Sequence, residues 1–504
     1  MASACPVSVL EFAARLLNTE LLNTELLMLT ARFIQDLRRI VGDEAVLHRE
    51  EDLMLYEYDG GLSTGSPEVV VLPRTTAQVA EIVRHACAAG VCIVPRGAGT
   101  GLSGGAIPRK GGVVIGFSRM NRILEVDVPN LRAVVQPGVV NLEISQEVAR
   151  YGLYFAPDPS SQKACTIGGN VAENAGGPHT LAYGVTVNHV TGLEVVLPDG
   201  RIVQLGGKAL DLCGYDLTGF FVGSEGTLGI TTAVTIKLMR LPEAVVTMLG
   251  IFDTVEAAAN TVTAITAGGI TPSALEMLDG LTMRAVEGYA HAGYPLDAAA
   301  GLLIELEGLH EAVAEQVQEV SAVCQRLGVR ELRRAGNEAE RQSLWKGRKN
   351  AFGALGRLAP AYYTQDGVVP RTKIAEVLHF VDSVSKKYEL LIGNVFHAGD
   401  GNLHPCILFD PRDPAQVHRT HEAGREILEY CIQVGGTITG EHGIGMEKNE
   451  LMSSLFTADD LEIMQRLHDA FNPLSMLNPQ KVFPTSRSCR ETAQSRPPAL
   501  AGDL

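Results

Sequence analysis

The feature that most constrains this chain is a glycine-rich loop directly after a predicted strand. Residues 91–94 read as a buried strand, and the loop PRGAGTGLSGG (95–105) that follows carries five glycines. Backbone N–H groups in such a run can converge on an anion, and Thr100 and Ser103 add hydroxyl donors. A simple turn needs only one or two glycines, so the loop predicts a site for a phosphate-bearing ligand.

This loop lacks the context of the Rossmann dinucleotide fingerprint. Residues 99–104 satisfy GxGxxG, but that fingerprint opens a helix whose N-terminus holds the pyrophosphate. Here Pro108, Gly111 and Gly112 follow within a few residues and leave no room for such a helix. The sequence therefore favours an anion nest made by the backbone over a Rossmann site.

Two further glycine-rich stretches, GGNVAENAGG (168–177) and GSEGTLGI (223–230), occur in the same part of the chain. Around them the pattern alternates between strands and helices, which indicates one α+β domain over residues 65–242. The predicted elements are a strand at 69–72, a helix with a Thr75/Gln78 capping box, a hairpin at 123–128 and 131–135, and strands at 193–197 and 231–238. Three such loops in one domain predict one long ligand with a phosphate core.

The composition changes near Pro242, where long helices at 311–327, 372–389 and 414–434 begin to alternate with short strands. This pattern predicts a second α+β domain, in line with two or three domains for 504 residues. We therefore divide the chain into a helical N-terminal segment (1–64), the domain at 65–242, a second domain (243–445), a returning C-terminal segment (446–484) and a disordered tail (485–504).

The formal net charge of −16 argues against nucleic acid or an anionic membrane bound through bulk charge, so local donors must hold any anionic ligand. The nine cysteines form no CxxC pair, which indicates a reducing compartment and offers no framework for an iron–sulfur cluster. We find neither a signal peptide nor an apolar run of roughly 18 residues, so we expect a cytoplasmic protein without a transmembrane segment.

The N-terminal segment contains a tandem LLNTE repeat at residues 16–25, inside a leucine-rich stretch that continues to Ile40. The spacing predicts a helix. Such a helix can dock a partner protein or pack on the body of its own chain, and apolar helical stripes are more often part of a core.

A second constellation lies in the segments FHAGDGNLHP (396–405) and GEHGIG (440–445). Asp400 and Gly401 form a turn dipeptide, so we expect a hairpin that pairs His397 directly with His404 on one sheet face, with Asp400 as a turn residue. Two histidines and a carboxylate from the second segment can hold Zn²⁺ or a related ion. Paired histidines near a turn can equally be hydrogen-bonded structural groups.

The motifs PRGAGTGLSGG, GGNVAENAGG, GYDLTGFFVGSEGTLGI and LNPQKVFP, in this order, resemble the FAD-binding oxidoreductase family related to vanillyl-alcohol oxidase and to cytochrome-linked D-lactate dehydrogenase. The resemblance covers residues 67–484. It implies an α+β fold with a two-lobed FAD-binding domain of the vanillyl-alcohol oxidase type, and an α+β substrate domain with an antiparallel sheet.

The resemblance also assigns residues to FAD, with the pyrophosphate on the first loop and Asn478 closing the site. The assigned residues are Arg96, Gly97, Ala98, Gly99, Thr100, Gly101, Ser103, Gly104, Gly105, Gly169, Gly177, Gly223, Glu225, Gly226, Ile230 and Asn478. Covalent members of the family carry a histidine at the position of Thr100. Threonine has no ring nitrogen to bond the flavin, so we expect noncovalent FAD.

In the 2-hydroxyacid dehydrogenase branch, the positions of His397, His404 and Glu441 hold a divalent metal, here expected to be Zn or Mn. His442 matches the proposed base, and Arg348 matches the arginine that binds the substrate carboxylate. This set suits the chemistry, because oxidation of a 2-hydroxy acid needs loss of the hydroxyl proton and transfer of the Cα hydride to flavin N5.

Relatives that oxidise D-2-hydroxyglutarate meet the second carboxylate with Lys, Thr and Asn, whereas the matching positions here are Thr364, Phe352 and Cys406. We therefore expect a small D-2-hydroxy monocarboxylate, glycolate or D-lactate. The alternatives are a D-2-hydroxyglutarate-type dehydrogenase, a flavin transferase of the ether-lipid synthase branch, and a noncatalytic assembly subunit. The complete set of histidines and Glu441 favours oxidation.

The segments YYTQDGVVP and FHAGDGNLHP most resemble the glycolate oxidase branch, whose catalytic flavin subunit works with a second FAD-type subunit and an iron–sulfur subunit. The resemblance thus implies electron-accepting partner subunits, which can hold the protein at the membrane periphery. The absence of a nicotinamide fingerprint agrees with a separate acceptor.

Overall fold

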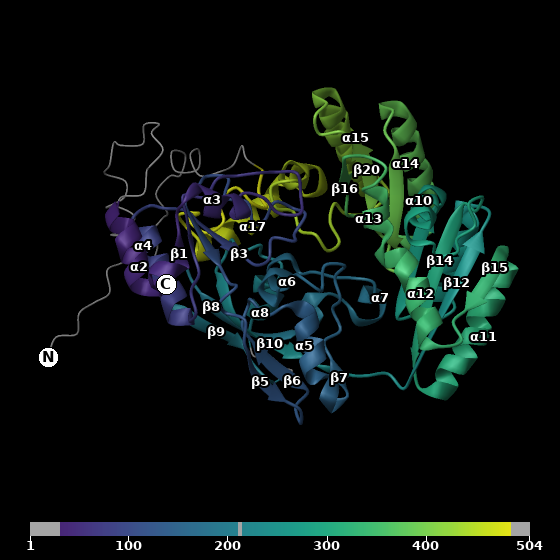
Figure 1. The fold of residues 1–504 in the computed structure, drawn as a ribbon, viewed down its shortest axis with the longest axis horizontal. Coiled ribbons are helices and arrows are strands. Elements are labelled where there is room, and N and C mark those ends of the chain that lie inside the picture. The colour runs from purple at the N-terminus through teal and green to yellow at the C-terminus, as the bar shows by residue number, and fades with distance from the viewer. Residues whose placement is uncertain (1–30, 210–213, 485–504) are drawn as a thin grey trace.

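The computed structural model describes residues 31–209 and 214–484. The LLNTE repeat and the tail predicted to be disordered lie outside these residues. Figure 1 shows two bodies, one purple to teal with the yellow C-terminal segment, the other teal to green. None of the described helices is both long and apolar enough to cross a membrane.

The first lobe of the FAD-binding domain is a four-stranded sheet in the order β1-β2-β4-β3. Its elements are α2 (Ala31–Val41), β1 (Val46–Leu47), α3 (Glu50–Leu53), β2 (Val69–Val71), α4 (Thr76–Ala88), β3 (Ile93–Arg96) and β4 (Val113–Gly116). The predicted capping box is present in part, since the Thr75 side chain accepts a hydrogen bond from the Gln78 N–H. Strand β4, which separates β2 from β3, was not predicted from the sequence. Nor was β1, which pairs with β2 from within the segment expected to be helical.

The second lobe is a five-stranded antiparallel sheet in the order β5-β6-β10-β8-β9, as the two-lobed prediction requires. Its elements are β5 (Ile123–Asp127), β6 (Arg132–Val135), α5 (Asn141–Val148), β7 (Leu153–Tyr154), α6 (Ile167–Glu173), α7 (Thr180–Tyr183), β8 (Val190–Val196), β9 (Ile202–Gly206), α8 (Leu217–Phe221), β10 (Ile230–Lys237) and β11 (Met239–Arg240). The glycine-rich segment at 168–177 runs through α6, and the one at 223–230 leads into β10.

The second domain, which the sequence predicts to bind the substrate and which we call the substrate domain, contains a nine-stranded antiparallel sheet; this confirms the predicted sheet type. Its strands are β12 (Ala244–Phe252), β13 (Ala274–Asp279), β14 (Ala300–Gly308), β15 (Val329–Arg334), β16 (Ala361–Thr364), β17 (Gly367–Val368), β18 (Ile392–His397), β19 (Asn402–Leu403) and β20 (Pro405–Phe409). Its helices are α9 (Val255–Ala267), α10 (Gly280–Ala290), α11 (His310–Arg326), α12 (Glu338–Lys349), α13 (Ala351–Leu355), α14 (Ile374–Tyr388) and α15 (Pro414–Gln433).

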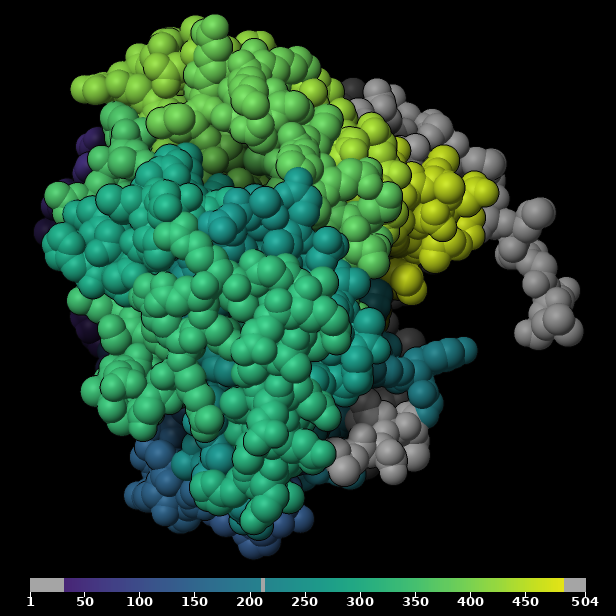
Figure 2. Space-filling model, turned by 90° about the vertical axis from the view of Figure 1, so that its right-hand side faces the viewer, coloured from purple at the N-terminus to yellow at the C-terminus, as the bar shows by residue number. Residues whose placement is uncertain are grey.

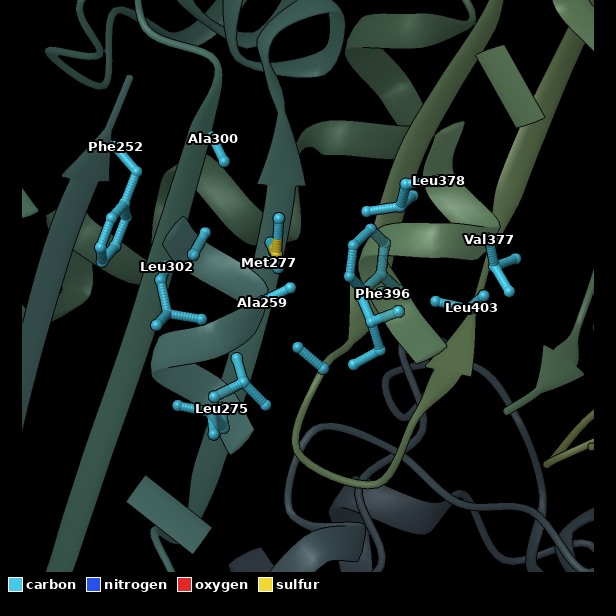
Figure 3. Packing of buried hydrophobic residues seen from close by; sticks show 14 of the residues in the cluster. Phe252, Ala259, Leu275, Met277, Ala300, Leu302, Val377, Leu378, Phe396 and Leu403 are labelled. Carbon is cyan, nitrogen blue, oxygen red and sulfur yellow. The ribbon is translucent and has the colours of Figure 1, made fainter. Parts of the chain in front are cut away.

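Helices cover both faces of this sheet. Buried residues of α9, α11, α14 and α15 pack on one face, and those of α10 and α13 pack on the other. Figure 3 shows part of the core on the face that α9, α11, α14 and α15 cover. Met277 of β13 and Phe396 of β18 lie in this core, together with Leu403, which follows the turn of the hairpin. This packing fixes the hairpin that carries the two histidines.

The C-terminal segment, with α16 (Met452–Leu455) and α17 (Ala458–Phe471), returns to the FAD-binding domain. Leu477 pairs with Ile93 of β3, and the Asn478 N–H donates to the Ile93 carbonyl. Figure 2, turned to face the substrate domain, shows this yellow segment at the edge of the green surface. Residues 477 and 478 thus lie beside β3, the strand that leads into the first glycine-rich loop.

Candidate active site

One cavity joins the glycine-rich loops to the histidine hairpin. On the side of the FAD-binding domain its wall includes the loop after β3, α6 and the residues before β10. On the other side the wall is made by residues of the substrate domain and of the GEHG segment. These are Lys349, Phe352, Tyr362, Thr364, His404, Glu441 and His442.

At two positions of the loop after β3, Gly97 and Gly99, the neighbouring atoms leave no space for a side chain. A Cβ on Gly97 would overlap the Thr166 hydroxyl. Gly99 has φ +71°, where L side chains are strained, and a Cβ there would overlap the Arg96 guanidinium. The loop therefore presents its backbone to the cavity.

Three buried polar atoms on residues of the cavity wall have no hydrogen-bond partner among the described residues. They are Arg96 Nη1, Thr166 Oγ1 and Asn478 Oδ1. Buried polar groups are rarely left unpaired, so these two donors and one acceptor fit a bound polar ligand. A guanidinium beside exposed loop backbone suits a diphosphate, which FAD carries.

The structure brings twelve of the sixteen residues assigned to FAD into this wall: Arg96, Gly97, Ala98, Gly99, Thr100, Gly101, Gly105, Gly169, Glu225, Gly226, Ile230 and Asn478. Ser103, Gly104, Gly177 and Gly223 do not line it. Ser103 is fully buried, with its hydroxyl toward Glu173 and its carbonyl accepting from the Met446 N–H, so it is not the hydroxyl donor to the ligand that the sequence predicted. Gly104 packs on Met446.

Two of the assigned residues also hold the wall together. The Glu225 carboxylate accepts from the N–H groups of Ile444 and Gly445, each at 2.6 Å. The Asn478 side-chain amide donates to the carbonyls of Gly105, at 2.8 Å, and Glu225, at 2.6 Å. Asn478 thus joins the first and third glycine-rich loops.

The predicted register of the histidine hairpin is wrong by two residues. His397 pairs with Asn402, and Asn394 pairs with Pro405. A shift of two residues leaves side chains on the same face, so both imidazoles still point to one place. Asp400 accepts from the Asn402 N–H at 3.1 Å, as a turn residue does.

The two imidazoles and Glu441 form a compact group. Glu441 Oε1 lies 3.2 Å from His397 Nε2 and 3.2 Å from His404 Nε2, and the two rings are perpendicular with centroids 5.1 Å apart. One ligand atom of each residue lies within 4.8 Å of the others, as a single metal ion would require. Burial would raise the pKa of Glu441, but the two histidines hold it well below its ordinary value.

Glu276 of β13 stands behind this group. Its carboxylate lies 2.7 Å from His397 Nδ1 and accepts from Arg348 Nε at 2.7 Å, with both side chains buried. A carboxylate on the second nitrogen orients a ligating histidine. Burial would raise the pKa of Glu276, but His397 and Arg348 lower it.

Arg348 does not line the cavity. It is 3% exposed, its Nε is held by Glu276, and its Nη2 has no partner among the described residues. Its neighbour Lys349, which sequence reasoning passed over, lines the cavity instead.

His442 stacks on His404, with ring centroids 4.9 Å apart and planes 10° apart. Its Nε2 lies 3.9 Å from Glu441 Oε1. Burial, chiefly, lowers the pKa of His442 to about 4. The ring is therefore neutral at neutral pH, and one of its nitrogens keeps a free lone pair.

Sequence reasoning missed Glu276 and Asp366, the two carboxylates that hold the site. Glu276 interrupts an otherwise buried apolar strand, which was an available signal because an unpaired buried charge is costly. Asp366 precedes a Gly in a polar turn-like sequence and gave no such signal.

The two halves of the chain match two known domain families. Residues 67–206 match the family described as "FAD binding domain", and residues 241–482 match "FAD linked oxidases, C-terminal domain". The chain is 48% identical over 456 residues to glycolate oxidase subunit GlcD of Escherichia coli (strain K12), with 90% of this chain and 91% of that protein covered. It is 33% identical to the mitochondrial D-lactate dehydrogenase [cytochrome] of Arabidopsis thaliana, covering 83% of this chain and 74% of that protein.

Solved structures show the same fold at low identity. p-Cresol methylhydroxylase with substrate bound matches with a TM-score of 0.77 and 18% identity, covering 91% of this chain and 98% of that one. Alkyldihydroxyacetonephosphate synthase matches with a TM-score of 0.71 and 19% identity, covering 90% and 86%. From its two domain matches and its relatives, the chain belongs to the family of FAD-linked oxidases and is an FAD-linked oxidoreductase.

Proposed function

We propose that the chain oxidises a small D-2-hydroxy acid, glycolate or D-lactate, to the 2-oxo acid with noncovalent FAD and a divalent metal. The observation that carries this proposal is the single cavity whose wall holds both the glycine-rich loops and the residues His404, Glu441 and His442. Names of the relatives support it, since they include a glycolate oxidase subunit and a D-lactate dehydrogenase.

The loops would hold FAD by its diphosphate, with Arg96 as the cation and Thr166 and Asn478 as further polar partners. Bound FAD supplies the acceptor for the hydride of the substrate Cα. Thr100 lies on the wall with no ring nitrogen to offer, so acid precipitation should release the flavin into the supernatant. Flavin retained on the precipitated protein would contradict noncovalent binding.

His397, His404 and Glu441 would hold the metal, zinc or manganese, with coordination positions left open. A divalent cation bound there supplies a Lewis acid that lowers the pKa of a coordinated hydroxyl. His442 accepts the hydroxyl proton on its ring, which reaches the cavity and is held parallel to His404.

The substrate carboxylate needs a cation at the same end of the cavity. Arg348 lies behind the cavity wall, but its Nη2 has no hydrogen-bond partner among the described residues, and its guanidinium lies 6.0 Å from the ring of Phe352, which lines the cavity. We therefore keep Arg348 as the proposed partner of the carboxylate next to the hydroxyl. Phe352 and Tyr362 also line the cavity and offer no charge to a second carboxylate, which favours a monocarboxylate substrate.

One observation favours a second candidate function, a D-2-hydroxyglutarate dehydrogenase. Thr364 and Cys406 face one another at 3.6 Å and offer no charge, but Lys349 lines the cavity, with its ammonium over the ring of Trp345, 5.3 Å from the centroid. That ammonium could meet a second carboxylate. Lys349→Met separates the two functions, because it should raise the KM for D-2-hydroxyglutarate and leave that for glycolate unchanged.

The direct test is anaerobic mixing of the purified flavoprotein with glycolate, D-lactate, L-lactate and D-2-hydroxyglutarate while the flavin absorbance is followed. We expect glycolate or D-lactate to bleach the flavin fastest and L-lactate to leave it oxidised. Bleaching by dithionite but by none of the four acids would contradict the proposed function.

We also propose that electrons leave to a separate redox protein, namely second flavin-type and iron–sulfur subunits. No group of described residues that could hold a metal includes a cysteine, and the E. coli relative is itself named a subunit. The isolated chain should then turn over with a dye but not with NAD. Hydrogen peroxide formed as fast as dye is reduced would show that no partner is needed.

A further inference from the structure

One buried carboxylate, that of Asp366, accepts hydrogen bonds from the backbone of the segment that carries Glu441 and His442. Asp366 has no exposed surface, and its carboxylate accepts from three consecutive backbone N–H groups of residues 440–442, at 2.9 to 3.3 Å. The Thr439 hydroxyl, at 2.6 Å, and the Lys448 ammonium, at 3.2 Å, donate to it as well. Five donors thus converge on one side chain.

The segment depends on these bonds because it is neither helix nor strand. A Cβ on Gly440 would overlap the Asn402 amide. Gly443 has φ +85°, and a Cβ there would overlap the Glu173 carboxylate. Apart from these packed glycines, Asp366 supplies the bonds that fix the direction of the backbone at Glu441 and His442. Side-chain placement there follows the backbone.

We propose that Asp366 is the positioning residue of this site, holding the 440–442 backbone so that Glu441 meets the two histidines and His442 stacks on His404. This inference rests on the proposed function for its catalytic consequence, but its structural part does not. Asp366 sits just before β17, and the carbonyl of the preceding Gln365 lies 3.2 Å from His404 Nδ1. One short segment therefore orients His404, Glu441 and His442 together.

The same atoms exclude a role for Asp366 as a second metal ligand. Asp366, His404 and His442 do offer atoms within 4.8 Å of one another. However, Oδ2 of Asp366 lies within hydrogen-bonding distance of all five donors. Its Oδ1 shares the Glu441 N–H at 3.3 Å and lies 3.9 Å from His404 Nδ1, the nitrogen that faces the Gln365 carbonyl. The Asp366 carboxylate is therefore engaged mainly by the backbone of residues 440–442, Thr439 and Lys448.

The experiment compares Asp366→Asn with Asp279→Asn in the full-length, flavin-loaded protein. Asp279 is a matched control, since its carboxylate also accepts three N–H bonds in the same domain but none from residues 439–448. An asparagine amide keeps the shape of aspartate but removes the negative charge that the three N–H groups and the Lys448 ammonium face, and it turns one acceptor into a donor.

The first readout is hydrogen–deuterium exchange of residues 437–446, which needs neither substrate nor metal. We expect faster exchange there in Asp366→Asn and wild-type exchange in Asp279→Asn. Wild-type exchange in Asp366→Asn would overturn the proposal whatever the protein oxidises.

The second readout is the anaerobic rate of flavin reduction per bound flavin, which a loss of stability alone would not change. Loss of a group that orients ligands costs roughly 10- to 100-fold in activity, and we expect such a loss for Asp366→Asn, with the KM little changed. An unchanged rate per bound flavin alongside faster exchange would overturn the catalytic part. If no acid reduces the wild-type flavin, the proposed function fails while the exchange result still decides the placement.

Should Asp366→Asn fail to fold, Thr439→Val removes one of the five donors and leaves the carboxylate. We expect it to lower the rate per bound flavin about three- to tenfold, the worth of one net hydrogen bond. A wild-type rate and wild-type exchange in this variant would count against the proposal.

Discussion

The two sides of the cavity are built by opposite means. On the side of the FAD-binding domain, glycines remove side chains so that backbone forms the wall, and Gly97 and Gly99 have no space for a Cβ. On the side of the substrate domain, side chains form the wall, and buried charged residues behind it hold Glu441 in place through the ion pairs Arg348–Glu276–His397–Glu441. The cofactor side should therefore be sensitive to added volume, and the chemical side to lost charge.

The largest effect on stability should come from breaking the buried ion pairs that Glu276 forms with Arg348 and His397. Glu276→Gln leaves Arg348 and His397 buried beside a neutral group, and loss of one partner of a buried pair costs about 3–5 kcal/mol. We expect the apparent free energy of unfolding in urea to fall by that amount.

Glu462→Gln is the matched control. It breaks an exposed pair with Arg466 on α17, where both side chains are more than half exposed, and exposed pairs contribute at most about 1 kcal/mol. If the two substitutions lower the free energy of unfolding equally, the buried ion pairs of Glu276 stabilise the protein no more than an exposed pair does.

A smaller effect should follow from adding volume on the cofactor side. Gly99→Ala puts a side chain at φ +71° and against Arg96, at a cost of about 2 kcal/mol, which is about 30-fold in the dissociation constant of FAD. Gly207→Ala adds the same methyl group where no atom lies within 4 Å and should bind FAD as the wild type does. Flavin fluorescence titration measures both, and equal affinities would contradict a backbone-built cradle.

The smallest effect concerns the contact that joins the two sides. His179 of the FAD-binding domain lies 2.8 Å from Asp158 and 3.3 Å from Glu305 of β14, and it stacks on Trp345. Burial would lower the pKa of His179, but the two carboxylates raise it well above its ordinary value. Folding therefore takes up a proton, and this stabilisation is complete below the unfolded pKa of about 6.5 and is lost as pH rises through the folded pKa.

We expect His179→Gln to lower the free energy of unfolding by about 1 kcal/mol at pH 6 and by less at pH 9. His379→Gln, at an exposed pair with Glu256, should change it by less than about 0.5 kcal/mol at both values. A difference between wild type and His179→Gln that grows from pH 6 to pH 9 would show that the histidine is not held charged.

What the sequence predicted well was local. The helices at 311–327 and 414–434 correspond to α11 and α15 within one residue at each end, because apolar periodicity and the N-terminal Pro414 mark them. The sequence correctly predicted that His397 and His404 lie on one face of the sheet. Side chains alternate between the two faces with a period of two, so a register shift of two residues leaves both histidines on the same face.

What the sequence did not predict depends on pairing across long distances in the chain. Glu276 reaches His397 across 121 residues, and Asp366 reaches His442 across 76. Strand β4 was missed because its insertion between β2 and β3 is a property of the sheet, which local periodicity does not report.

The central claim is that the protein binds flavin on one side of the cavity and performs chemistry with the other. His404→Ala tests it most directly, because His404 lies on the cavity wall within the group formed with His397 and Glu441 and contacts none of the glycine-rich loops through a hydrogen bond among the described residues. The measurement is the flavin spectrum of this variant under anaerobic conditions, first with the substrate that bleaches the wild type and then with dithionite. We expect His404→Ala to hold oxidised flavin that the substrate leaves unchanged and dithionite bleaches. Bleaching by substrate at the wild-type rate would show that His404 is not needed for the chemistry.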